Sequence, residues 1–225
     1  FQSSAYHEDK RNKKTIKESH SQYRFERMMQ LVNENDQLTP QKAVEILRNR
    51  KGVDDKKIGY GNEKAINQLL AHHGIVFKPE EKKVWLSANP YQMGAFISYD
   101  LDHVFTEFEK GNVSGSVMNA EEVIPASDFL QTRNYKNYEA HRKLREQFIQ
   151  DLEDENPIDT KDAEALKHLN PYFCQAYYLS GQYYYREGNY KQAIIDFKQA
   201  LVREVTTLPD KEHLEKLLKK SYRKL

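Results

Sequence analysis

The sequence predicts an α+β protein whose strands gather in one part of the chain and whose downstream part is helical. Two runs rich in β-forming residues, 74–77 and 84–86, flank a polar segment that contains a proline, which is typical of an antiparallel hairpin. A third strand is expected around Phe96–Tyr99. Beyond residue 127, apolar residues recur at helical spacing. Strands and helices that are segregated in this way favour the α+β class.

Composition narrows the range of functions. The 225 residues are enough for one large domain or two small ones, and 38% apolar with 31% charged residues is typical of a soluble protein. The net charge of +1 gives no general argument for a nucleic-acid partner. No apolar run approaches the ~18 residues that cross a membrane. The compartment stays unknown, and export would need a signal outside this chain.

Two helices are expected in the first third, after a polar surface loop at 1–19. The first begins near Ser21 and places apolar residues on one side, which we expect to face the core: Phe25, Met28, Met29 and Val32. The second opens at Thr39 and Pro40, with a hydroxyl at the cap and proline at the first helical position.

The sheet is expected to end with the third strand, because residues 109–122 are rich in Gly, Asn and Ser and favour a linker. The predicted organisation is therefore a first domain at 1–108, a linker at 109–126 and a helical tail at 127–225. Ser127 or Asp128 is expected to cap a long charged helix, and Thr160 a shorter one that ends before Pro171.

The tail contains a stretch, residues 176–201, that resembles the tetratricopeptide repeat, so a repeat is expected at about 174–207. Gly181 and Ala193 fall where the two helices of such a hairpin press together, so Leu should be more damaging at Gly181 than at Ser180. A degenerate repeat is expected at about 140–171, and a helix at 210–225 covers the terminal face. This tail either binds a peptide or is a stabilising appendage on the first domain.

Reactive side chains are few. Cys174, the single cysteine, lies among aromatic residues and is expected to be a buried apolar group rather than a nucleophile. His72 and His73 are adjacent, so on a strand they would point to opposite faces and could not share an ion. We predict no metal and no cofactor. The Gly59-Tyr60-Gly61 segment is expected to be a turn rather than a phosphate loop.

Arg24 is the candidate site residue. At 100° per residue it lies beside Met28 on the flank of the apolar side of its helix, whereas Arg27 is expected to point further toward solvent. A half-buried guanidinium needs an anionic partner, because an unpaired buried charge is costly. Arg24 is therefore either a structural ion-pair partner or a functional group.

Three segments together resemble one family: Ser21–Arg27, the helix after Thr39, and the hairpin with its following strand. They are similar to the C-terminal half of the acyl-coenzyme A:6-aminopenicillanic-acid acyltransferase-like proteins, relatives of choloylglycine hydrolases and penicillin V acylases. The resemblance covers roughly residues 1–108, and the tail from about 125 onward lies outside it.

The resemblance implies an N-terminal-nucleophile fold, an αββα sandwich of two antiparallel sheets between helices. In that family a precursor cleaves itself to expose an N-terminal Cys, whose own α-amine acts as the base. It also implies an arginine near the nucleophile, and Arg24 is the match. Residue 1 here is Phe, so the nucleophile is expected on a missing N-terminal half or a companion chain.

Two functions remain open. The first is the downstream segment of an amide or thioester hydrolase or acyltransferase. The second is a non-catalytic interaction protein, in which a degenerate enzyme fold carries a helical adaptor. A Gly-Cys junction upstream of Phe1 would favour the enzyme, and other residue types there would favour the adaptor.

Overall fold

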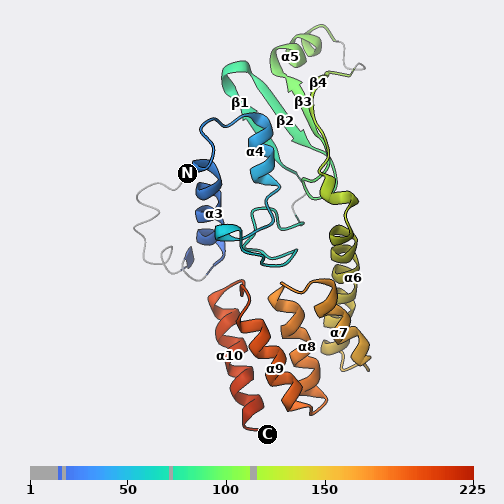
Figure 1. Cartoon of the computed structure of the whole chain (residues 1–225). Coiled ribbons are helices and arrows are strands. Elements are labelled where there is room, and N and C mark those ends of the chain that lie inside the picture. The colour runs from blue at the N-terminus through green and yellow to red at the C-terminus, as the bar shows by residue number, and fades with distance from the viewer. Residues whose placement is uncertain (1–14, 17–18, 71–72, 112–115) are drawn as a thin grey trace.

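A computed structural model of the chain describes residues 15–16, 19–70, 73–111 and 116–225 (Figure 1). The predicted loop at 1–19 lies mostly outside the described residues, as do His72 and the middle of the predicted linker. Within the described part the chain contains one antiparallel sheet and a helical tail, so the α+β class is confirmed.

The sheet has four strands in the order β1-β2-β3-β4, and every neighbouring pair is antiparallel. The strands are β1 (Ile75–Lys78), β2 (Lys83–Ser87), β3 (Phe96–Asp100) and β4 (Met118–Ile124). The predicted hairpin and third strand are confirmed. The prediction that the sheet ends there is wrong, because β4 lies inside the segment predicted to be a linker. β4 is a charged edge strand, in which Glu122 contacts Lys83 and accepts a hydrogen bond from Trp85 through its backbone carbonyl.

Eight α-helices lie in the described part of the chain. They are α3 (Ser21–Asn33), α4 (Pro40–Leu47), α5 (Leu101–Glu109), α6 (Arg133–Glu153), α7 (Thr160–Leu169), α8 (Cys174–Arg186), α9 (Tyr190–Leu201) and α10 (Leu208–Tyr222). Short 3-10 helices are η1 (Val53–Asp55), η2 (Pro79–Glu81) and η3 (Asp128–Gln131). Among these described helices, none is both long enough and apolar enough to cross a bilayer.

One of the three predicted helix caps is confirmed. The side chain of Thr39 accepts a hydrogen bond from the Lys42 N–H at the start of α4. Ser127 caps η3 instead of the long helix, and Thr132 caps α6 after that 3-10 turn. The cap of α7 is Asp159, one residue before the predicted Thr160. In both corrected cases, a second Ser, Thr or Asp nearby offers an equally good cap, and the local turn decides between them.

One face of the sheet is covered and the other is open. Val44 of α4 packs with Val76, Trp85, Phe96 and Ile124 in a small buried core on the first face. On the opposite face, cross-strand pairing aligns only apolar or aromatic residues: Ile75, Phe77, Val84, Leu86, Ile97, Tyr99 and Met118. Phe77 is 65% exposed, Met118 48% and Ile75 47%. The sheet therefore has one helical layer and, on the opposite side, an apolar face that is exposed in part, since Val84 within that face is only 8% exposed.

The expected orientation of α3 is wrong. Phe25, Met28 and Met29 are 52%, 40% and 38% exposed, so this apolar stripe does not face the core. The inward side carries Tyr23, whose hydroxyl accepts a hydrogen bond from the Val53 N–H, and the buried Arg27. Polar contacts with η1 therefore set the rotation of α3, and the apolar periodicity predicts the wrong side.

The tail is a stack of antiparallel helices, with α8 and α9 forming a hairpin around the Gly188 turn (Figure 1). Gly181 lies where the two helices meet, because a Cβ added there would lie 2.6 Å from ring atoms of Phe197. A polar cluster joins three helices: buried Asp196 of α9 accepts hydrogen bonds from Ser180 of α8 and Lys167 of α7. The terminal helix α10 packs on α9 and buries Leu214, as predicted.

The tail is joined to the sheet unit through the loop after η1. The Asn170 side chain accepts a hydrogen bond from the Tyr60 N–H at 3.1 Å and donates one to the Tyr60 carbonyl at 2.8 Å. Gly59 has a φ of 84°, and a Cβ there would lie 2.5 Å from Phe173, so this predicted turn requires glycine. The Asn62 side chain also donates to the backbone carbonyl of Glu204 at 3.0 Å. These contacts hold the tail against the first part of the chain.

His141 of α6 makes this junction sensitive to pH. It is 1% exposed, its ring lies edge-on to Phe173, and its Nε2 has no hydrogen-bond partner among the described residues. Burial, with a smaller contribution from Arg145, lowers the pKa of His141 from 6.5 to about 4. The unfolded chain therefore binds this proton at a higher pH than the folded protein does, so stability falls as the pH drops from 6.5 toward 4.

Between pH ~6.5 and ~5 the wild type should lose about 1.5 kcal/mol more unfolding free energy than His141→Gln does, because Gln does not titrate in that range. Urea denaturation of both proteins at the two pH values measures this difference. His103→Gln, at an exposed position on α5, serves as the control and should leave the pH dependence of the wild type unchanged. An unchanged pH dependence in His141→Gln would contradict the prediction.

Candidate functional site

The predicted half-buried position of Arg24 is confirmed, whereas the predicted solvent-facing position of Arg27 is wrong. Arg27 is the buried one, at 1% exposure, whereas Arg24 is half-buried on the flank of α3. Arg24 donates a hydrogen bond from Nη1 to the backbone carbonyl of Glu63 at 2.9 Å. Among the described residues, no carboxylate lies within ion-pair distance of Arg24. Arg24 is therefore bound to the loop of residues 61–64 through a neutral group.

Arg27 is committed to a structural cluster. Its guanidinium pairs with Asp55 of η1, donates to Gln30 at 2.7 Å and donates to Asn49 at 3.3 Å. Lys51 contacts the same carboxylate at 3.0 Å, and hydrogen bonds from Lys51 and Arg27 lower the pKa of Asp55. Arg27, which the sequence predicts to point toward solvent, is thus the residue whose contacts hold α3 against η1.

The remaining predicted groups show no catalytic arrangement. Cys174 is buried at the start of α8, and burial raises the pKa of its thiol to about 11, which disfavours the reactive thiolate. This agrees with the predicted core role. Among the described residues, no group of three or more His, Cys, Asp or Glu could hold a metal ion.

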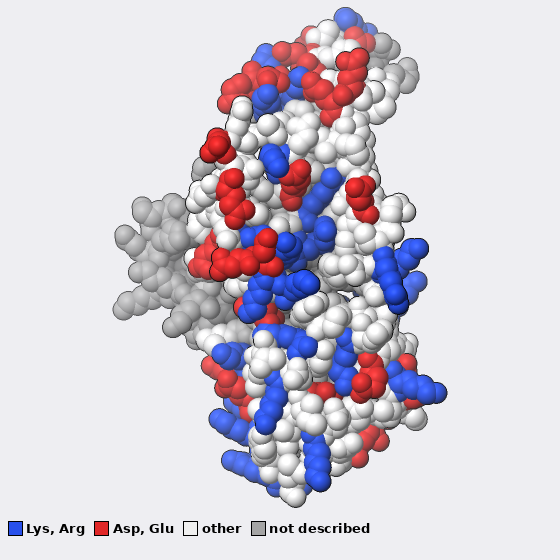
Figure 2. Space-filling view, viewed as in Figure 1, with Lys and Arg blue, Asp and Glu red and all other residues white. Residues whose placement is uncertain are grey.

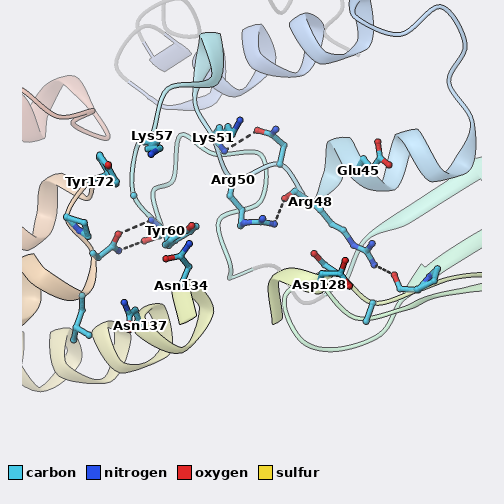
Figure 3. A pocket seen from close by; sticks show the side chains of 18 of the residues that line it. Glu45, Arg48, Arg50, Lys51, Lys57, Tyr60, Asp128, Asn134, Asn137 and Tyr172 are labelled. Carbon is cyan, nitrogen blue, oxygen red and sulfur yellow. Dashed lines mark hydrogen bonds between the residues drawn. The ribbon is translucent and has the colours of Figure 1, made fainter. Parts of the chain in front are cut away.

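A cleft with a volume of about 1010 Å³ lies between the sheet unit and the tail. One wall consists of the end of α4 and the following loop, at 48–60, and the other of the start of α6 and the α7–α8 junction. Lys and Arg gather across the waist of the molecule, between the sheet and the terminal helices (Figure 2). The close view shows Lys57 beside Tyr172, and Asn134 and Asn137 on the helix below Tyr60 (Figure 3). We call this cavity the cationic cleft.

Four cations line the cationic cleft: Arg48, Arg50, Lys51 and Lys57. Arg48 is fixed by backbone carbonyls, because it donates to Gly94 at 2.6 Å and to Pro125 at 2.8 Å. Those contacts join α4 to the segments beside β3 and β4. They satisfy its hydrogen bonds but leave its charge uncompensated.

Arg50 has the most enclosed charged group of the four. Its Cζ lies 3.9 Å from the centroid of the Phe129 ring, and its Nη1 donates to the Arg48 carbonyl at 2.9 Å. Its Nε is buried without a hydrogen-bond partner among the described residues. Burial lowers the pKa of Arg50, and no carboxylate of the described chain lies within ion-pair distance of it. A desolvated cation of this kind is costly unless an anion neutralises it.

The cleft was not predicted from the sequence, although one signal was available. Residues 48–51, Arg-Asn-Arg-Lys, form a short basic run just after the second predicted helix, and Lys56 and Lys57 follow. Such runs are usually solvated surface, so the run alone does not indicate a site. Only the packing of the tail across the loop turns it into one wall of a cleft.

Comparison with protein-family models, with curated proteins and with solved structures gives no match.

Proposed function

We propose that this chain is the downstream segment of an amide or thioester hydrolase or acyltransferase, whose N-terminal Cys nucleophile lies outside it. The observation that carries the proposal is the antiparallel sheet with a helical layer on one face and a partly exposed apolar face on the other. An αββα protein has two sheets packed face to face, so half of it would present one sheet with a helical layer on one side and an apolar face on the other. That is the arrangement of β1–β4 with α4.

The exposed apolar face supports the expected partner. In β1, β2 and β3 its residues alternate with those that pack on α4, which favours burial of this face. A second sheet, from a missing N-terminal half or a companion chain that carries the nucleophile, would cover Ile75, Phe77, Leu86 and Met118. Sheets that pack face to face lie about 10 Å apart, which these large side chains can fill.

The resemblance assigns the arginine of the site to Arg24. Because Arg27 is committed to Asp55, Arg24 is the one of the two whose charge is free to act on a thiolate. A cation beside the nucleophile would lower the pKa of the thiol and stabilise the developing negative charge. The role of Arg24 follows only if the second sheet brings the nucleophile to the α3 side.

The tail fits a tetratricopeptide-like hairpin that stabilises the first part of the chain. Its Gly181 and Phe197 contact is the close helix approach that this repeat needs. Asn170 and Glu204 attach it to the loop of residues 56–62, which favours an appendage over a free peptide-binding groove.

The test is to express the full-length gene and to assay amide and thioester hydrolysis. We expect hydrolysis that iodoacetamide abolishes, and Arg24→Lys should lower turnover at least tenfold with an unchanged melting temperature, because Lys keeps the charge but loses the planar fork. Arg133→Lys, at an exposed position on α6, is the matched control and should keep full activity.

Three outcomes would count against the proposal. Absence of thiol-dependent hydrolysis would favour the alternative, a non-catalytic interaction protein with a helical adaptor. Loss of stability in step with activity would make Arg24 a structural residue. Full activity in Arg24→Lys would remove the site from α3.

A further inference from the structure

We propose that the cationic cleft is a binding site for a small molecule that carries a phosphate monoester group. This site is separate from the exposed sheet face, and it does not depend on the proposed hydrolase or acyltransferase activity.

The charge balance of the lining carries the first step. Lys51 is paired with Asp55 at 3.0 Å, and the remaining cations, Arg48, Arg50 and Lys57, face one unpaired lining carboxylate, Asp128, which leaves an excess of two positive charges. The whole chain has a net charge of only +1, so the excess is local. Glu45 is already paired with Lys42 at 2.9 Å, and it lies at the α4 end of the cleft, away from Lys57 and Tyr172 (Figure 3). An occupant with two negative charges would neutralise the cleft.

The second step is that the cations are held in place. Arg50 lies against the Phe129 ring, and that ring packs against Tyr60 with 5.1 Å between centroids. Lys57 lies 5.1 Å from the centroid of the Tyr172 ring, on the other side of the cleft. Aromatic contacts orient these groups without neutralising them. Since little order remains to be imposed on binding, the entropic cost of holding an anion is small.

The third step is the chemistry of the opposite wall. Asn134 and Asn137, one helical turn apart on α6, line the cleft together with Ser127. Their amide and hydroxyl groups can donate to anionic oxygens without adding charge. Both asparagines lie in the first turns of a 21-residue helix, where the positive end of the helix dipole also favours an anion.

These features favour a phosphate monoester over a carboxylate. A phosphate monoester carries about −1.5 to −2 charges at neutral pH and has three acceptor oxygens, which matches two excess cations and donors on both walls. A single carboxylate would leave one positive charge uncompensated. The cleft volume of about 1010 Å³ leaves space for an organic group beside the phosphate, next to Tyr60 and Tyr172.

Isothermal titration calorimetry of the whole chain with phenyl phosphate tests the proposal, with benzoate and inorganic phosphate as comparison probes. We expect phenyl phosphate to bind at least tenfold more tightly than benzoate, and its affinity to fall with rising salt. Equal affinities for phenyl phosphate and benzoate would overturn the phosphate assignment. Absence of phenyl phosphate binding at millimolar concentrations would overturn the site.

Three variants locate the binding. Arg50→Gln is expected to weaken phenyl phosphate binding at least tenfold, but it also removes the contact with Phe129 and could unfold the loop. Asn137→Asp and the exposed Lys57→Gln test the cleft without that risk, and each should weaken binding severalfold while the melting temperature stays unchanged. Arg133→Gln, which changes the charge just outside the lining, should bind like the wild type. Equal loss in Arg133→Gln and Lys57→Gln would show a general charge effect and overturn the site.

Discussion

Replacing Gly181 with Leu is expected to lower the free energy of unfolding by about 2 kcal/mol or more. The first atom of the new side chain would already lie 2.6 Å from two atoms of the Phe197 ring, which is fully buried. The ring has no free space to move into, because it belongs to the core that α8 and α9 share with Leu166, Ala193 and Leu214. The helices must separate, and neighbouring core contacts loosen with them.

Urea denaturation of the whole chain measures the effect. Gln182→Leu, at the next position of α8, should change stability little, because Gln182 is half-buried rather than buried. Ser180, where Leu is expected to be less damaging than at Gly181, is itself buried and donates to Asp196 at 2.6 Å. Leu at that position should also be destabilising, through loss of one buried hydrogen bond to Asp196 rather than through a clash with the ring. Small and equal effects at Gly181 and Gln182 would contradict the helix contact.

Arg27→Leu is expected to destabilise the protein by about 3 kcal/mol. The substitution removes the ion pair with Asp55 and leaves the side-chain oxygens of Gln30 and Asn49 without their buried donor. Leu also fills less of the space that the 1% exposed arginine occupies. The loss should loosen α3 from η1.

Arg24→Leu is the matched comparison on the same helix. It removes one hydrogen bond to a backbone carbonyl at a half-buried position, so it should cost about 1 kcal/mol. Thermal or urea unfolding of the two variants, followed by circular dichroism, gives the difference. A larger loss for Arg24→Leu than for Arg27→Leu would contradict the assignment of the buried arginine.

The elements that the sequence predicts well are those whose signal is local. The turn chemistry around residues 79–82 and the β-rich runs beside it are enough to place β1 and β2, and Thr39 with Pro40 marks the start of α4. β4 could not be found in this way. Its sequence, Met-Asn-Ala-Glu-Glu-Val-Ile, lacks apolar alternation, because an edge strand needs only part of one face buried.

For the site residues, prediction from the sequence fails for a different reason. Helical periodicity gives the angular relation between Arg24 and Arg27, but which side of α3 faces inward depends on a distant carboxylate, Asp55, and on the Val53 N–H. Likewise, the basic run at 48–51 becomes a cleft only when α6 and α7 pack across it. The local sequence pattern shows which side of a segment could be buried. The long-range polar contacts then determine which side is buried in the folded chain.

The Asn170 side chain resembles a piece of β-strand. With one acceptor and one donor it pairs with both backbone groups of Tyr60, as the neighbouring residue of an antiparallel ladder would. Amide exchange at Tyr60 is therefore coupled to the helices of the tail rather than to its own loop. The cleft lies across this pairing, so its two walls cannot separate until the amide pair breaks.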